Sequence, residues 1–194
     1  MPPPGRRTRA IHKGVGLPRG RRRGGPVTGA PRPPYAAAPT VLHTTVTDPL
    51  ARPLLDELTH EYRTRYEKPV DLSLEYPPEE FTPPRGAFLL LLADGGPVAG
   101  GAYRRYDAHT AEFKRIWTHS AHRRRGLARR VLDVLERDAA DRGYTRVYLT
   151  TGPRQPEAKG LYLAAGYRPL FDPTADPETI GPLPFEKHLE IPRP

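Results

Sequence analysis

The sequence predicts an α+β (α/β) fold in which a central sheet is flanked by helices and preceded by a disordered N-terminal tail. Short β-type runs and amphipathic helical segments alternate from residue 41 onward, with a strand-loop-helix-strand unit over 111–151. At 194 residues, the chain is about the size of one domain. Residues 1–40 contain too few large apolar side chains to form a core. We therefore expect one domain at 41–194.

The predicted tail, residues 1–40, is rich in Pro, Gly and Arg and carries most of the charge asymmetry. It contains nine Arg or Lys and no acidic residue, whereas residues 41–194 contain 22 basic and 22 acidic residues. The net charge of +9 therefore belongs to the tail. A polybasic arm favours contact with nucleic acid or the ribosome, because attraction to phosphate does not depend on sequence. The alternatives are a passive extension and a start codon placed too early.

Composition excludes several classes of site. The chain has no cysteine, so disulfides, thiolate nucleophiles and cysteine-based zinc sites are ruled out. The seven histidines form no paired metal-ligand spacing, and we expect no metal. No apolar run approaches the roughly 20 residues that span a bilayer, and the first residues lack the apolar stretch of a secretory signal. We expect a cytoplasmic protein that does not contact a membrane.

The first elements of the domain are a strand, a helix and a long connection. An apolar run predicts a strand at 41–47, after which Asp48 and Pro49 suit the start of a helix. Residues 67–86 show no sustained period and predict a long connection with room for one short helix. The expected buried face of the first helix repeats every four residues: Leu50, Leu54, Leu58, Tyr62 and Tyr66.

The remaining elements alternate between strands and helices. Two apolar runs joined by 94–96 predict an antiparallel hairpin, and 111–118 predicts a third strand whose alternation is imperfect. The clearest helix repeats Leu127, Val131, Leu135 and Ala139 and ends at Gly143. The other expected elements are strands at 144–151, 167–171 and 183–191 and a helix at 156–166.

The segment His122–Arg130, which reads HRRRGLARR, carries the strongest chemical pattern. It lies between a strand and the start of an amphipathic helix, where unpaired N–H groups and the helix dipole favour phosphate. Gly126 leaves room for a ligand to approach the backbone. Four arginines add positive charge that suits a pyrophosphate: Arg123, Arg124, Arg125 and Arg129. The alternative is a solvated basic patch.

Residues Arg123–Ala128 resemble the R/Q-x-x-G-x-G/A signature of the GNAT superfamily of acyl-CoA N-acyltransferases. The similarity is sharp over 111–170 and extends over 41–190 in element order. It implies a GNAT-like fold with a central mixed, mostly antiparallel sheet. It also implies an enzyme that binds acetyl-CoA as co-substrate and transfers the acetyl group to a primary amine.

The resemblance also implies which residues bind acetyl-CoA. Backbone N–H groups from Arg124 to Arg129, including those of Leu127 and Ala128, would bind the pyrophosphate. The main chain of Ile116, Trp117 and Thr118 would pair with the pantetheine arm as an added strand would. Gln155 stands where the family commonly has Asn, and it would contact the same arm.

Two residues are candidates for proton transfer on the same grounds. Glu112 occupies the position where some family members place the base that deprotonates the amine; the alternatives are a carboxylate paired with a nearby cation, and water as the base. Tyr162 occupies the position from which the family often protonates the departing thiolate. Its phenol, with a pKa of about 10, stays protonated at neutral pH. The alternative is a tyrosine that only packs in the core.

The acceptor is not identified by the sequence. The resemblance implies that it enters between 67–80 and 171–180, and both segments are acidic, which favours a cationic amine. Two rival functions remain: a nucleic-acid or ribosome-associated protein acting through its tail, and a catalytically silent acyl-CoA sensor. The oligomeric state is open, a homodimer included.

Overall fold

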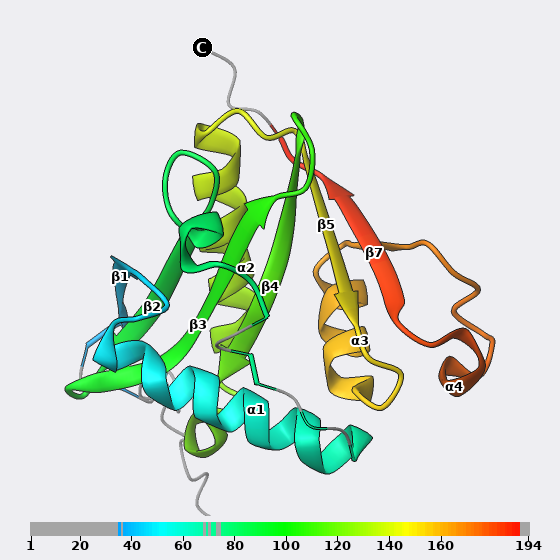
Figure 1. The fold of residues 1–194 in the computed structure, drawn as a ribbon, viewed down its shortest axis with the longest axis horizontal. Helices are drawn as coiled ribbons and strands as arrows, with labels where there is room; N and C mark the ends of the chain where they lie inside the picture. The colour runs from blue at the N-terminus through cyan, green and yellow to red at the C-terminus, as the bar shows by residue number, and fades with distance from the viewer. Residues whose placement is uncertain (1–34, 36, 68, 70, 73–74, 191–194) are drawn as a thin grey trace, which may run out of the picture. The chain divides into compact units, whose positions relative to one another are not determined.

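The computed structural model describes residue 35 and residues 37–67, 69, 71–72 and 75–190, and a mixed sheet organises them (Figure 1). The strand order is β1-β2-β3-β4-β5-β7-β6. The β4–β5 pair is parallel, and the other five neighbouring pairs are antiparallel. The predicted mixed, mostly antiparallel sheet with flanking helices is therefore confirmed. The strands are β1 (Thr40–Thr44), β2 (Ala87–Ala93), β3 (Gly96–Arg105), β4 (Thr110–Thr118), β5 (Arg146–Thr151), β6 (Arg168–Pro169) and β7 (Leu183–His188).

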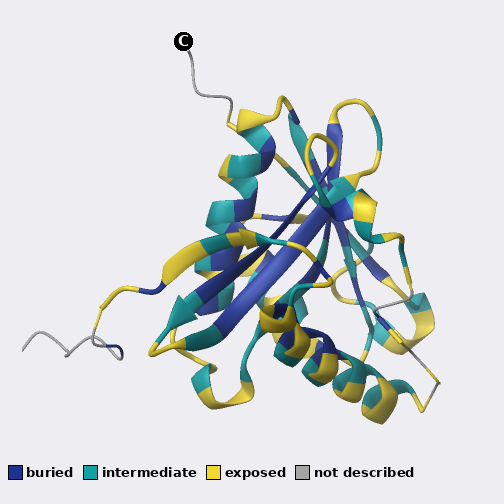
Figure 2. Cartoon of the chain, turned by 60° about the vertical axis from the view of Figure 1, so that its left-hand side comes forward, coloured by how far each residue is buried: buried dark blue, intermediate teal, exposed yellow. Residues whose placement is uncertain are grey.

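Helices cover both faces of the sheet. The α-helices are α1 (Arg52–Tyr66), α2 (Leu127–Asp141), α3 (Pro156–Ala164) and α4 (Pro177–Ile180), and short 3-10 helices span Pro49–Ala51, Pro78–Phe81 and Ser120–His122. In β2, Phe88 and Leu90 belong to the hydrophobic cluster that contains the buried leucines of α1. Leu89 and Leu91 belong to the other cluster, which contains the buried residues of α2. This double coverage explains why 87–92 is continuously apolar, and Figure 2 shows the central strands buried.

The start of the first helix differs from the prediction. Asp48 accepts a hydrogen bond from the Leu50 N–H at 2.8 Å, but it caps the 3-10 helix Pro49–Ala51, and α1 begins only at Arg52. A 3-10 turn has about 3.0 residues per turn and changes the phase of the helix that follows. Leu50 is consequently 39% exposed, so its place on the predicted buried face was wrong.

Strand β4 leaves its parallel neighbour halfway along its length. Residues 110–113 pair with 146–149 of β5, and beyond Phe113 the two strands diverge, as Figure 1 shows. On the other side of β4, Gly100 pairs with Trp117 and Ala102 with Lys114, which leaves a β-bulge around position 115. The second half of β4 therefore has no strand partner on its β5 side within the described chain.

The last three strands are shorter than predicted, and the start of the packed domain lies elsewhere. Of the predicted strands at 144–151, 167–171 and 183–191, the structure forms 146–151, 168–169 and 183–188. Most of the predicted tail, 1–34 and 36, lies outside the described residues. Tyr35 is 6% exposed and β1 starts at Thr40, so packed structure begins before residue 41. Within the described chain, no helix has the length and apolar character needed to cross a membrane.

Candidate active site

Two cavities meet beside the divergent half of β4. The smaller, of about 400 Å³, lies between this strand and the N-terminal ends of α2 and α3. The larger, of about 960 Å³, is bounded by α1, β4, β5, residues 69, 71, 72 and 75, and the segment 178–182. Residues that border both cavities mark where a molecule in one can reach a molecule in the other: Leu58, Ile116, Gln155, Ala158 and Tyr162.

The N-terminus of α2 borders the smaller cavity without a side-chain cap. Gly126 occupies the N-cap position with a φ of 75°, in the left-handed region that favours glycine. A Cβ built at Gly126 would meet no heavy atom within 4 Å. An uncapped helix end with open space in front of it is the arrangement that receives an anion.

The four predicted arginines differ in their surroundings. Arg123 pairs with Glu61 at 3.0 Å, and Arg129 pairs with Asp133 at 3.0 Å. Arg124 lines the smaller cavity and has no ion-pair partner within the described chain. The guanidinium of Arg125 instead lies over the ring of Tyr35, 5.4 Å from its centre, and does not line either cavity. Three of the four side chains therefore border the site.

The unpaired edge of β4 supplies the wall of the smaller cavity, where Ile116, Trp117 and Thr118 lie. The hydroxyl Oγ1 of Thr118 is buried and has no hydrogen-bond partner within the described residues. A buried hydroxyl without a partner costs free energy, about 1–3 kcal/mol. The strand edge and this hydroxyl together can accept an extended chain that carries amide groups.

Two acidic residues of α1, which the sequence analysis missed, hold the strand and the arginine loop together. Glu57 accepts hydrogen bonds from the Trp117 indole at 2.9 Å and from the Ser120 backbone N–H at 3.1 Å. Burial opposes ionisation of Glu57, but these hydrogen bonds outweigh it and lower the pKa of Glu57. One turn later, Glu61 pairs with Arg123. In the sequence, Glu57 and Glu61 could have been recognised by their spacing of four residues, which places both on one face of the predicted helix.

Gln155 is buried at the junction of the two cavities. Its Oε1 accepts hydrogen bonds from the Thr151 hydroxyl at 3.1 Å and the Gly152 N–H at 3.0 Å. Its Nε2 donates to Glu61 at 3.3 Å. The predicted contact residue is thus held in place by three protein groups.

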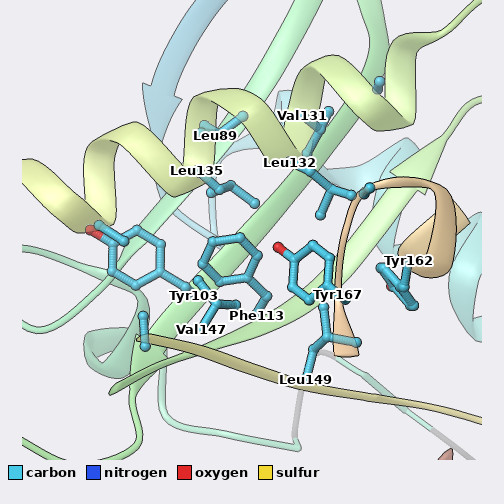
Figure 3. Close-up of a cluster of buried hydrophobic side chains, with 14 of the residues drawn as sticks. Leu89, Tyr103, Phe113, Val131, Leu132, Leu135, Val147, Leu149, Tyr162 and Tyr167 are labelled. Carbon is cyan, nitrogen blue, oxygen red and sulfur yellow. The ribbon is translucent and has the colours of Figure 1, made fainter. Parts of the chain in front are cut away.

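Tyr162 also lies at the junction and is 6% exposed. Its ring packs against Tyr167 and Phe185, with centroids 5.7 and 5.5 Å away, at the edge of the core cluster in Figure 3. The hydroxyl forms no hydrogen bond within the described chain. Burial, with a smaller contribution from Tyr62, raises the pKa of Tyr162 above that of a free phenol. The residue combines core packing with a protonated hydroxyl beside both cavities.

Glu112, in contrast, is enclosed by cations. Its carboxylate lies 2.7 Å from the Arg104 Nε and 3.0 Å from the Lys114 Nζ, and it lines neither cavity. Burial opposes the charge of Lys114, but the hydrogen bond and the charge of Glu112 outweigh it and raise the pKa of Lys114. This geometry matches the paired carboxylate that the sequence left open as an alternative, and the role of base stays a prediction.

The two acidic segments predicted to receive the acceptor both reach the larger cavity. Asp71 and Glu75 line it from one side and Glu178 from the other, where Glu178 pairs with Arg154 at 2.8 Å. Other acids of these segments do not line the cavity; Asp176 caps α4, and Glu80 pairs with Arg104. Among the described residues, no group of three His, Cys, Asp or Glu could hold a metal ion.

Comparisons with known proteins agree with this arrangement. The uncharacterized N-acetyltransferase YsnE of Bacillus subtilis (strain 168) is 33% identical over 93 residues, which cover 45% of this chain and 62% of that protein. The chain therefore matches less than two thirds of that relative's length.

Solved structures share the fold. A protein of Klebsiella pneumoniae subsp. pneumoniae MGH 78578, designated an acyl-CoA N-acyltransferase, has a TM-score of 0.63 and 26% identity, over 78% of this chain and 98% of that chain. A GNAT family acetyltransferase from Elizabethkingia anophelis, solved with acetyl-CoA bound, has a TM-score of 0.54 and 16% identity, over 78% of this chain and 99% of that chain. A family model described as the acetyltransferase (GNAT) family matches residues 52–167. The chain belongs to the GNAT acetyltransferase family.

Proposed function

We propose that this protein is an N-acetyltransferase that moves the acetyl group of acetyl-CoA to a primary amine. The observation that carries the proposal is the junction of two cavities at Tyr162, beside the unpaired edge of β4. Acetyl-CoA occupies the smaller cavity, and the amine enters through the larger one. The acetyl-CoA in the related Elizabethkingia structure supports the choice of ligand.

The smaller cavity suits each part of acetyl-CoA. The uncapped N–H groups of α2 and the side chains of Arg123, Arg124 and Arg129 receive the pyrophosphate. The pantetheine amides pair with the free edge at 116–118, where the hydroxyl of Thr118 needs a partner. The thioester then lies near Ile116 and Tyr162, at the opening into the larger cavity.

The reaction moves one acetyl group and one proton. The amine nitrogen attacks the thioester carbonyl carbon, a C–N bond forms, and the C–S bond breaks. The departing thiolate, whose acid has a pKa of about 8.5 by analogy with cysteine, takes a proton. Tyr162 donates this proton as the C–S bond breaks, because its raised pKa keeps the phenol protonated until then, and the phenolate regains a proton from water.

The amine must lose a proton before or during attack. In this proposal Glu112, which lines neither cavity, accepts the proton through water that passes Lys114 on the wall of the larger cavity. Glu75 lines that cavity directly, so the substitution Glu75→Gln serves as the control for Glu112→Gln. Glu112→Gln should lower the rate most at low pH, where neutral amine is scarce, and Glu75→Gln should not. Parallel pH-rate profiles for wild type and Glu112→Gln would assign the proton to water or to Glu75.

A CoA-release assay with acetyl-CoA and a panel of amines tests the proposal. We expect turnover with at least one primary amine and stabilisation by acetyl-CoA alone, because a ligand that binds the folded state raises the melting temperature. Stabilisation without turnover of any amine would favour an acyl-CoA sensor. Neither stabilisation nor turnover would refute the proposed function.

A further inference from the structure

Arg115 carries a buried charge that the described protein compensates only in part. The residue lines the larger cavity and is 8% exposed. Its Nη2 donates a hydrogen bond to the backbone carbonyl of Leu72, and its guanidinium carbon lies 4.4 Å from the centre of the Phe81 ring. Its Nε and Nη1 are shielded from solvent and have no hydrogen-bond partner within the described residues.

The neighbouring cations, in contrast to Arg115, are paired with carboxylates. Arg104 and Lys114 both contact the carboxylate of Glu112, and Arg104 also contacts Glu80 at 2.7 Å. Arg115 contacts no carboxylate within 4.0 Å among the described residues. Removing an ion from water costs several kcal/mol unless a counter-charge replaces the lost hydration. A neutral carbonyl and an aromatic face compensate less than a carboxylate does.

The backbone holds Arg115 in this position. The residue lies in the β-bulge of β4 with a φ of 59°, in the left-handed region that is uncommon for a residue other than glycine. A bulge re-aims side chains, and here it leaves Arg115 on the wall of the larger cavity. The next residue, Ile116, borders both cavities. The cation therefore lies one residue from the place where the amine must react.

We infer that the acceptor is a small amine that also carries a carboxylate, such as an amino acid, and that Arg115 recognises the carboxylate. The inference rests on the proposed function. The carboxylate pairs with the Arg115 guanidinium, supplies the missing counter-charge and turns the amine toward Tyr162. Asp71 and Glu75, which line the same cavity, favour the ammonium form as it enters.

Matched acceptors test the inference. Each of the common L-amino acids is compared with its own carboxamide, which keeps the amine and side chain but removes the negative charge; a polyamine serves as a purely cationic acceptor. We expect wild type to prefer an amino acid over its amide at least tenfold in kcat/KM, because a charge-assisted hydrogen bond is lost. Equal rates, or a preference for amides or the polyamine, would overturn the inference.

Variants at position 115 separate recognition from packing. Arg115→Met keeps an unbranched side chain at the same backbone position, and Arg115→Lys keeps the charge. We expect Arg115→Met to lose the preference for the carboxylate through a raised KM and to melt at the same temperature as wild type or higher, because an under-compensated charge is removed. Arg115→Lys should retain part of the preference. A lower melting temperature for Arg115→Met with an unchanged preference would show that the role is structural.

The role of Arg115 can be tested even if no acceptor is acetylated. If no acceptor turns over, the same pairs are compared by the melting temperature in the presence of CoA. An amino acid that stabilises wild type more than its amide does, and not Arg115→Met, would support Arg115 while the proposed function fails. Equal stabilisation by both members of every pair would overturn the inference on its own.

Discussion

Replacing Tyr162 with phenylalanine separates its two possible roles, because the substitution removes one oxygen and keeps the ring. The ring supplies the packing against Tyr167 and Phe185. The hydroxyl has no hydrogen-bond partner within the described chain, so its removal leaves no buried group unpaired. We therefore expect the free energy of unfolding to change by no more than about 0.5 kcal/mol.

The effect on turnover should be much larger. A positioned proton donor contributes roughly a hundredfold to ten-thousandfold, or about 3–5 kcal/mol of activation free energy. Water can replace the phenol in part, so we expect kcat to fall at least tenfold while the affinity for acetyl-CoA is unchanged. The assays are CoA release under saturating acetyl-CoA, calorimetric titration of acetyl-CoA, and thermal melting.

Two results would refute this reasoning. Unchanged kcat with a lowered melting temperature would show that Tyr162 serves the core alone. A parallel loss of acetyl-CoA affinity and rate would mean that the hydroxyl binds the thioester in the ground state, and not that it acts as the acid.

Three further predictions concern the Gly126 loop, the Glu57 carboxylate that bonds Trp117 and Ser120, and the N-terminal tail. Gly126→Glu should abolish acetyl-CoA binding, whereas Gly126→Ala, which meets open space, should keep binding and lose only about 1 kcal/mol of stability to its φ of 75°; equal affinity in wild type and a folded Gly126→Glu would contradict this. Glu57→Gln should cost about 1 kcal/mol at pH 7 in urea unfolding. Because the folded pKa of Glu57 is lowered, the stability that Glu57 contributes is complete above its unfolded pKa of about 4.3 and is lost as pH falls through the folded value. If Glu57→Gln still lowered the free energy of unfolding by the same amount at pH 2, the ionised carboxylate would not be the group that stabilises the fold. A chain that starts at Pro33 should acetylate as fast as the full chain, since it keeps the contacts of Tyr35 with His122 and Arg125. A start at Val41 removes these contacts with the loop before α2 and should weaken acetyl-CoA binding; salt-sensitive binding of nucleic acid or ribosomes by the full chain alone would give the tail a targeting role.

Periodicity and composition predicted the order of most strands and helices. Patterns such as Leu127, Val131, Leu135 and Ala139 report burial directly, and all four are buried. The boundaries were less accurate because turns and pairing decide them. Leu50 has the right spacing for the buried face, yet a 3-10 turn rotates it outward. The short helix α4 carries too few residues to show a period.

The candidate site divides in the same way. The Gly126 loop is a contiguous segment that the sequence can single out, and the structure places it beside the smaller cavity. Residues that act through distant partners could not be predicted. Glu57 becomes visible only when α1 lies against β4 and the Trp117 indole meets its carboxylate. The charge on Arg115 looks ordinary in the sequence, and only the folded cavity shows that part of it lacks a partner.

The most direct test of the central claim is to follow the acetyl group itself. Acetyl-CoA with an isotopically labelled acetyl group is incubated with the protein and the amine panel, and the products are identified by mass spectrometry while released CoA is measured. The account predicts one labelled acetyl group on the nitrogen of a primary amine for each CoA released, with the rate reduced in Tyr162→Phe. CoA release without a labelled amine, or no release although acetyl-CoA binds, would contradict it.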